Sequence, residues 1–431
     1  MIEIREYNAN DEKLQAILRR GSDIDADVRA AVEKIIAGVR ARGDAALCEF
    51  SEKFDGVKLT PEKIRVAPEE FEEAQGKVAE DFLTAVALAR VNIRRFHEYQ
   101  RRAAYVHDDG DGVRLSKRVL PLKKVGVCCP AKSAPLFSSM LMNVIPAQVA
   151  GVGEIYAVVP PRADGTVDPH ILVTAKLLGI DAVFRVGGAH AVAALAYGTK
   201  AIPAVDKIAG PGNAYVTMAK RLVFGACGID SLAGPSELVI IADGLAKAKY
   251  VAADLMSQLE HGSGWEVGVV FTTSRDLAAG IKIEVERQLQ KLERKEKIIH
   301  ALEKYGAIYL CEDLSDGMDA SNLIAPEHLE IIAVDEDELL SEVENAGAVF
   351  LGPFSAEPVG DYFAGTNHVL PTGGAARFSS SLSVYDFVKD ISVIEYSAER
   401  LQRAGRHIVR MAEIEGLTAH ANAIRVRLED L

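Results

Sequence analysis

The chain has 431 residues, which is long enough for two or three domains with sizeable cores. Apolar residues make up 49% and charged residues 26% of the chain, as in ordinary globular proteins, and no apolar run reaches the roughly 18 residues of a membrane span. The formal net charge of −13 argues against nonspecific binding to nucleic acid, because an acidic surface repels phosphates.

The N-terminal sequence and the cysteine content favour a cytoplasmic location. The first residues, MIEIREYNANDEKL, are polar and mixed in charge, unlike a signal peptide. The five cysteines form no C-x-x-C pattern, and an odd number does not pair completely; they are Cys48, Cys128, Cys129, Cys227 and Cys311. We therefore expect free thiols in a reducing compartment, with neither a disulfide framework nor an all-cysteine zinc site.

The first hundred residues have a helical pattern. Residues 24–54 place apolar side chains at helical spacing, and Gly43 predicts a break between two helices. Residues 68–102 are charged, with an apolar stripe, which is typical of a helix with one solvated face. HDDGDG (107–112) predicts the turn of a hairpin between two extended segments.

From residue 123 onward, short apolar runs alternate with helical segments. The predicted strands are residues 125–129, 154–160, 181–186, 206–210, 237–242, 265–272, 306–311, 329–334 and 347–352. Strands and helices that alternate every 25 residues or roughly so predict parallel sheets with crossover helices. The fold class is therefore α/β, with two Rossmann-like parallel-sheet domains, N-terminal helical segments and a C-terminal helical tail.

Three Gly-rich loops lie next to predicted strands or helices: VGGAH (186–190), AGPGN (209–213) and AGPSE (233–237). In open α/β sheets, ligands bind beyond the carboxyl ends of the strands, and glycine lets a ligand approach the backbone closely. None of the loops is a G-x-G-x-x-G motif, so a nucleotide or anion pocket and a set of tight turns remain alternatives.

SQLEHG (257–262) closes a predicted helix, with Gly262 as its C-cap. Gln258 and His261 are three residues apart, so we expect them to share a helix face at a spacing that suits two ligands of one metal ion. A histidine at this place is also favoured by the helix dipole alone.

A Gly-rich and apparently irregular stretch follows at residues 359–378 and contains Asp361, Asn367 and His368. Such long loops in compact enzymes are usually functional. Asp361 could complete a metal site with Gln258 and His261, and a mixed oxygen and nitrogen ligand set suits Zn²⁺ or a similar divalent ion.

APEHLE (325–330) places Glu327 beside His328 before an apolar strand. A carboxylate and an imidazole can divide acid–base work there, while a polar turn with a helix-capping Glu is the alternative. Near the C-terminus, Glu415 and His420 of EGLTAH would by themselves indicate only a surface helix.

Together, these motifs resemble the histidinol dehydrogenase family, essentially from end to end. The matching segments, in the family's order, are DKIAGPGNAYV, AGPSELVIIAD, AADLMSQLEHG, APEHLE, GAVFLGPFSAEPVGDYFAGTNHVLPTGGAARF and EGLTAHANA. The resemblance implies a cytoplasmic homodimer that uses zinc and two NAD⁺ to oxidise L-histidinol, through L-histidinal, to L-histidine in histidine biosynthesis.

The resemblance also implies a role for each matching residue. Zinc ligands would be Gln258, His261, Asp361 and His420, and the catalytic pair Glu327 and His328. His328 suits the base that takes the hydroxyl proton, and Glu327 the base that activates water for aldehyde hydration. Substrate contacts would be Ser236, Gln258, His261, His328, Asp361, Glu415 and His420, the last two reaching the partner's site from the C-terminal segment.

The expected cofactor side departs from the family pattern. The family has Tyr, an apolar residue and Pro-Gly-Gly where this chain has Cys128, Cys129, Pro130, Ala131 and Lys132. By position, the NAD contacts would be Cys128, His190 in place of a Gln, and the retained Asn213. Lys132 could add a contact to the phosphates or could point into water.

Two other functions remain open. The chain could be a related zinc- and NAD-dependent dehydrogenase of another polar alcohol, such as a sulfopropanediol, although the retained Ser236 and Glu415 favour histidinol. It could also be a non-catalytic paralogue, which the altered cofactor loop suggests and the complete proton-transfer and zinc set argues against.

The domain organisation that we predict has four parts. They are an N-terminal extension (1–23), a first α/β domain in two pieces (24–122 and 236–380), a second α/β domain on the cofactor side (123–235) and a C-terminal dimerisation tail (381–431). The tail has the pattern of a helix, a short linker and a second helix from residue 400, and it is polar enough to need another surface, such as a second subunit.

Overall fold

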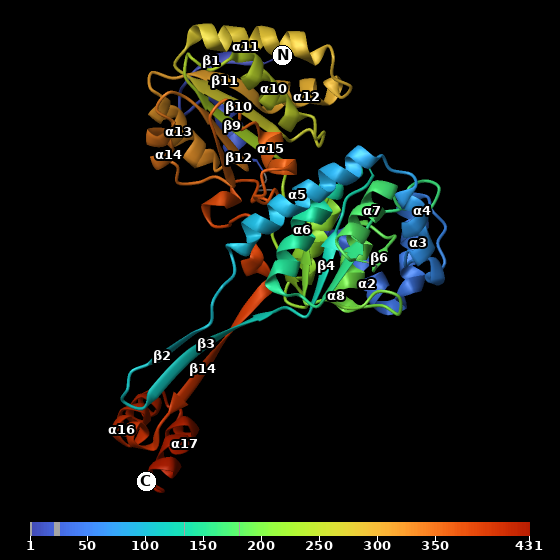
Figure 1. Ribbon diagram of the computed structural model, residues 1–431. Coiled ribbons are helices and arrows are strands. Elements are labelled where there is room, and N and C mark those ends of the chain that lie inside the picture. The colour runs from blue at the N-terminus through green and yellow to red at the C-terminus, as the bar shows by residue number, and fades with distance from the viewer. Residues whose placement is uncertain (1, 21–25, 133, 181) are drawn as a thin grey trace. The chain divides into compact units, whose positions relative to one another are not determined.

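The computed structural model describes residues 2–20, 26–132, 134–180 and 182–431. The chain divides into two compact units, one made of residues 1–100 and 123–387 and the other of residues 101–122 and 388–431. Figure 1 draws both units, and each is described by itself below. None of the described helices is both long and apolar enough to cross a membrane.

The first unit contains a six-stranded parallel sheet. Its order is β1 (Glu3–Glu6), β11 (Gly306–Leu310), β10 (Val267–Thr272), β9 (Glu237–Ala242), β12 (His328–Ile332) and β13 (Ala348–Leu351). Successive side chains of β9 point to opposite faces, so Leu238 and Ile240 enter one core while Val239 and Ile241 enter another. Burial on both faces explains the continuous apolar runs in these strands.

Helices cover both faces of this sheet (Figure 1). They are α1 (Glu12–Leu18), α10 (Ala248–Leu259), α11 (Arg275–Leu289), α12 (Lys295–Tyr305), α13 (Leu314–Ile324), α14 (Glu336–Ser341) and α15 (Glu357–Tyr362). The predicted N-terminal extension (1–23) contains β1, which pairs with β11 as an edge strand. Residues 1 and 21–23 of that prediction lie outside the described residues.

The same unit contains a five-stranded parallel sheet in the order β6 (Val183–Phe184), β5 (Glu154–Val158), β4 (Lys124–Cys128), β7 (Lys207–Ala209) and β8 (Gly228–Ile229). Its crossover helices are α6 (Phe137–Ala150), α7 (Pro169–Leu177), α8 (Gly188–Tyr197) and α9 (Ala214–Val223). The predicted strands of both sheets are thus confirmed, although residue 181 of one of them lies outside the described part of the chain.

The N-terminal helices pack on this second sheet's layer. They are α2 (Ala26–Arg42), α3 (Asp44–Asp55), α4 (Pro68–Gln75) and α5 (Glu80–Glu98), with a 3₁₀ turn at Pro61–Lys63. The buried stripe of α2, Val32, Ile35, Ile36 and Val39, meets α8 and α9, while α5 packs on α6 and α4 on α7. These contacts contradict the grouping of residues 24–122 with residues 236–380, because the apolar faces match helices of residues 123–235.

The second unit combines an antiparallel sheet with two helices. β14 (Val388–Tyr396) pairs with β3 (Val113–Pro121), which pairs with β2 (Tyr105–Asp108), so the predicted hairpin is confirmed. The predicted helix pair is α16 (Ala398–Ile414) and α17 (Thr418–Leu428). The predicted tail (381–431) contains the residues of β14 without predicting a strand there, and it leaves out the hairpin, because backbone pairing across about 270 residues has no local signal.

Candidate active site

A cavity of about 1340 Å³ lies within the first unit. The predicted site residues that line it are Cys128, His190, Asn213, Ser236, Gln258, His261, Glu327, His328 and Asp361. Glu415 and His420 belong to the second unit, where Glu415 caps the end of α16, His420 lies in α17, and both are exposed. The fold therefore brings nine of the eleven predicted residues to one cavity.

His328 is the first residue of β12 and is 3% exposed. Its Nδ1 lies 3.3 Å from the carbonyl oxygen of Glu237, and because a carbonyl only accepts, Nδ1 carries the hydrogen. Burial lowers the pKa of His328 to about 3, so the ring is neutral at pH 7. Its Nε2 has no hydrogen-bond partner within the described structure, which leaves a lone pair for a proton from a ligand.

Glu327 lies between the end of α13 and the start of β12, so the helix-capping alternative is wrong. Its Oε2 accepts a hydrogen bond from the Glu237 N–H at 3.3 Å and lies 3.7 Å from Nδ1 of His328. Burial, followed by the nearby charges of Glu237 and Asp361, raises the pKa of Glu327 well above its ordinary value. A carboxyl group with a raised pKa beside a neutral imidazole is suited to proton transfer.

Gln258 and His261 lie at the end of α10 but do not share a helix face. The helix ends at Leu259, so His261 lies in the following turn, which Gly262 continues with φ +83°. The side-chain oxygen and nitrogen of Gln258 are buried without a hydrogen-bond partner in the described chain. A buried amide without a hydrogen-bond partner lowers the stability of the fold. The unpaired Gln258 amide is therefore typical of a site that binds a ligand.

Residues 359–378 were predicted to be irregular. In the structure, Asp361 instead lies in the short helix α15. One turn earlier on that helix is Glu357, and ligand atoms of His328, Glu357 and Asp361 lie within 4.8 Å of one another. Glu357 is not among the predicted site residues, although its spacing of four residues from Asp361 places both carboxylates on one helix face and could have indicated it.

Several acidic groups are buried beneath this part of the cavity. Ser257 Oγ donates to Glu357 at 3.2 Å, and the Glu357 N–H donates to Glu330 at 3.1 Å. Burial raises the pKa of Glu357 to about 8 and that of Asp361 to about 6, and it raises that of Glu330 well above its usual range. Clustered buried carboxyls beside an unpaired amide and histidines fit a divalent metal ion with oxygen and nitrogen ligands.

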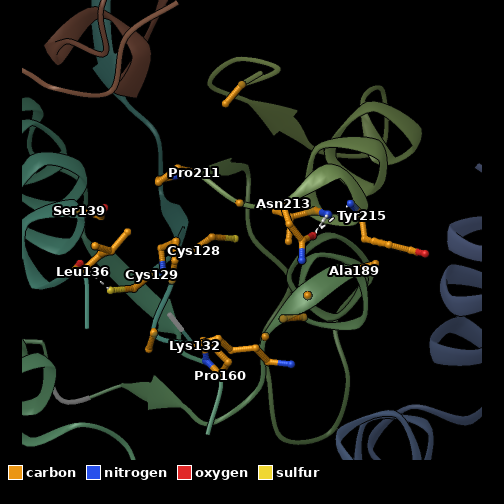
Figure 2. A pocket seen from close by; sticks show the side chains of 18 of the residues that line it. Cys128, Cys129, Lys132, Leu136, Ser139, Pro160, Ala189, Pro211, Asn213 and Tyr215 are labelled. Atoms are coloured by element: carbon orange, nitrogen blue, oxygen red, sulfur yellow. Dashed lines mark hydrogen bonds between the residues drawn. The ribbon is translucent and has the colours of Figure 1, made fainter. Parts of the chain in front are cut away.

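The other end of the cavity is formed by loops of the five-stranded sheet (Figure 2). Burial raises the pKa of both Cys128 and Cys129 to about 12, so both are thiols. All five cysteines of the chain are free, as predicted, and Cys129 Sγ lies 3.3 Å from the carbonyl oxygen of Leu136, to which it donates. Protonated, buried thiols are poor nucleophiles and poor metal ligands, so these two serve as small side chains of the cavity wall.

His190 and Lys132 are both held by α3. Burial and then Lys132 lower the pKa of His190 to about 3, and its Nε2 has no hydrogen-bond partner among the described residues. The His190 ring lies about 6 Å from the rings of Phe50 and Phe54. Lys132 Nζ lies 2.6 Å from Asp55 and donates to the Phe54 carbonyl at 3.0 Å, an arrangement that neither predicted alternative included.

Asn213 caps α9 through its side chain. Its Oδ1 accepts hydrogen bonds from the N–H groups of Tyr215 and Val216, each at 3.1 Å (Figure 2 labels Asn213 and Tyr215). Gly210, just before this cap, has φ +106°, and a Cβ there would lie 2.3 Å from the Cys128 carbonyl oxygen. Only glycine allows β4 and this loop to approach so closely.

Known proteins resemble this chain in sequence and in fold. The family model described as "Histidinol dehydrogenase" matches residues 18–428. The chain belongs to the histidinol dehydrogenase family. It is 49% identical over 414 residues to the histidinol dehydrogenase of Halalkalibacterium halodurans, a match that covers 96% of this chain and 97% of that relative.

Two further histidinol dehydrogenases are similar to this chain, one in sequence and one in sequence and fold. The relative from Geobacillus kaustophilus is 50% identical over 401 residues, with 93% of this chain and 94% of that protein covered. The crystal structure of histidinol dehydrogenase from Elizabethkingia anophelis superposes with a TM-score of 0.92 at 36% identity and covers 100% of this chain and 98% of that one. The family that the sequence motifs predicted is therefore confirmed, and it is a family of oxidoreductases.

Proposed function

We propose that this chain oxidises L-histidinol through L-histidinal to L-histidine, with NAD⁺ as the oxidant in both steps and zinc as the resident metal. One observation carries the proposal: a single cavity joins the buried pair Glu327 and His328, the unpaired Gln258 amide and the Gly-rich loops at the carboxyl ends of β6 and β7. That arrangement combines a base, a metal-binding group and a place for a dinucleotide.

His328 is the base of both oxidations. Its neutral Nε2 accepts the proton of the alcohol as the carbinol carbon transfers a hydride to NAD⁺, which yields the aldehyde and NADH. Glu327, as a carboxylate, takes a proton from the water that adds to the aldehyde. Protonated His328 returns its proton to the aldehyde oxygen in that addition. Its neutral Nε2 then accepts a hydroxyl proton of the hydrate as the second hydride passes to another NAD⁺, which yields the acid and a second NADH.

Zinc would be held by Gln258, His261 and Asp361 together with His420, and Glu357 lies close enough to Asp361 to assist. When bound, the metal would supply a Lewis acid that orients the nitrogen atoms of the substrate. Ser236, whose Oγ lies 3.4 Å from His261 Nδ1, and Glu415 would hold the substrate beside it.

NAD⁺ would lie along the cavity end that Cys128, His190 and Asn213 line. The neutral Nε2 of His190 offers one hydrogen bond in place of the amide that the family uses, and the first turn of α8, which has no side-chain cap, presents backbone N–H groups to phosphates. Cys128 contributes shape rather than charge.

In a homodimer with shared sites, Glu415 and His420 of one subunit would complete the set of predicted site residues of the other. The second unit carries Glu415 and His420 on exposed positions, and it also exposes large apolar side chains of β14 and α16, among them Ile394, Met411 and Ile414 at 67–73%. Apolar exposure of this extent favours burial against a second copy of the chain.

An NADH absorbance assay with histidinol, with and without a chelator, tests this function. We expect two NADH for each histidinol and loss of turnover on zinc removal. Turnover of dihydroxypropanesulfonate but not of histidinol would instead indicate the related alcohol dehydrogenase. Binding of histidinol by zinc-loaded protein without NADH formation would indicate a non-catalytic paralogue.

A further inference from the structure

Glu237, the first residue of β9, contacts both members of the catalytic pair through its own backbone. Its N–H donates to Oε2 of Glu327 at 3.3 Å, and its carbonyl oxygen lies 3.3 Å from Nδ1 of His328. The parallel pairing of β9 with β12, in which His328 faces Leu238, places these groups opposite each other. One residue of β9 thus sets the orientation of Glu327 and the tautomer of His328.

The side chain of Glu237 is fixed in turn. It forms an ion pair with Arg20, and the two side chains are only 4% and 2% exposed. The second carboxylate oxygen accepts a hydrogen bond from the Gly373 N–H at 3.2 Å. Neither Arg20 nor Glu237 is among the residues that line the cavity, so any influence on the reaction passes through Glu327 and His328.

A buried ion pair is a poor source of stability, because removing both charges from water costs about as much as their attraction returns. The ion pair instead fixes an orientation. Together with the hydrogen bond from Gly373, it allows only one arrangement of the Glu237 side chain. The Glu237 backbone, which contacts the catalytic pair, is held through the same side chain.

We propose that Arg20 and Glu237 are positioning residues, whose buried ion pair aligns the Glu237 backbone so that it orients Glu327 and His328 for both oxidation steps. This inference rests on the proposed function. It assigns no contact with substrate, metal or dinucleotide to either residue.

The test is an Arg20→Met variant, measured separately with histidinol and with histidinal below its melting temperature. We expect kcat to fall about 10- to 100-fold with both substrates, since displacements near 1 Å have such effects, while both KM values change less than about twofold. Zinc content should remain that of the wild type. Arg20→Lys, which retains the charge, should recover most of the lost kcat.

A second variant keeps the test informative if Arg20→Met does not fold. Glu237→Gln preserves the shape and the acceptor for Gly373 but removes the charge, and it should lower kcat in the same way. If the pair acts as a unit, the double variant Arg20→Met/Glu237→Gln should lose no more kcat than the Arg20→Met single variant.

The matched control is Arg185→Met, which removes a different arginine–glutamate pair, with Glu70, in the same unit; neither of these two residues lines the cavity. It should lower the melting temperature and leave kcat unchanged. The inference would be overturned if Arg20→Met behaved like this control, or if the effects of the two site variants were additive. Failure of the proposed function is distinct, because the wild type itself would then not reduce NAD⁺ with histidinol.

Discussion

Burial moves the pKa values of the adjacent residues Glu327 and His328 in opposite directions. Loss of water disfavours the charged form of each group, which raises the pKa of the carboxyl and lowers that of the imidazole. Two neighbours in the chain thus differ in the task they can perform. His328 is neutral and can accept a proton directly. Glu327 can accept a proton only after its own carboxyl group has lost one.

This difference predicts a selective effect of Glu327→Gln. The first oxidation needs His328 alone, whereas hydration of the aldehyde needs the Glu327 carboxylate. We expect histidinal oxidation to fall by about 10²- to 10⁴-fold, the usual contribution of a general base, with a much smaller loss in the first step. Stopped-flow measurement of NADH with each substrate checks this. A wild-type rate with histidinal would exclude Glu327 as the water-activating base, and His328→Asn should slow both steps.

His190 should make the stability of the chain depend on pH. Its pKa is about 3 in the folded chain and near 6.5 in an unfolded one, so its contribution is present above pH 6.5 and is lost as the pH falls toward 3. At pH 5 the expected loss is about 2 kcal/mol.

Urea unfolding of His190→Gln at pH 7 and pH 5 tests this expectation, since glutamine does not titrate and the pH dependence should flatten. The exposed His300 provides the control for the histidine-to-glutamine change itself, because its side chain is not buried in the fold. A wild-type slope in His190→Gln would show that the buried ring is not the cause.

At the scale of elements, the site depends on where strands end and on how closely neighbouring loops approach. Gly210 and Gly225 have nearly the same φ, +106° and +108°, but a Cβ at Gly210 meets the Cys128 carbonyl while one at Gly225 meets nothing within 4 Å. An alanine at Gly225 would therefore introduce backbone strain alone, whereas an alanine at Gly210 would introduce the same strain and a clash with Cys128.

We expect Gly225→Ala to cost about 1–3 kcal/mol in the free energy of unfolding, from strain alone. Gly210→Ala should cost more and should raise the KM for NAD⁺, because the loop before Asn213 must move away from β4. Chemical unfolding and initial rates at varied NAD⁺ measure both quantities. Equal stabilities and an unchanged KM would mean that the close approach has no role in cofactor binding.

Elements differ in how well their sequences predict them. The runs ELVIIA and GAIYLC form β9 and β11 because strands buried on both faces need continuous apolar side chains. β14 and the short helix α15 escaped sequence analysis, since β14 is largely exposed and α15 lies in a Gly-rich stretch. His261 follows α10 instead of ending it, because helix ends have weak local signals.

At the scale of the whole molecule, the proposal requires residues from both units. Ligands from the first unit, such as His261, and from the second, such as His420, would meet across two subunits of a homodimer. Mixing His261→Ala with His420→Ala therefore predicts recovery of activity, since a heterodimer has one site with both defects and one intact site.

Random reassortment yields heterodimers as half of the dimers, each with one of two sites intact, so we expect about a quarter of the wild-type activity. Each variant assayed alone should be nearly inactive and provides the control. No recovery after verified subunit exchange would argue that each site is built from one chain.

The sequence by itself determined the α/β class, the strands of the two parallel sheets and the family, because periodicity and motif order are local properties of the chain. The tertiary structure alone decided which surface each apolar face meets. It placed α2–α5 on the second sheet, joined Glu357 to Asp361 and His328, and brought Glu237 against Glu327 and His328. A periodic pattern shows that a face is apolar, but its partner elsewhere in the chain is selected by shape and packing in three dimensions.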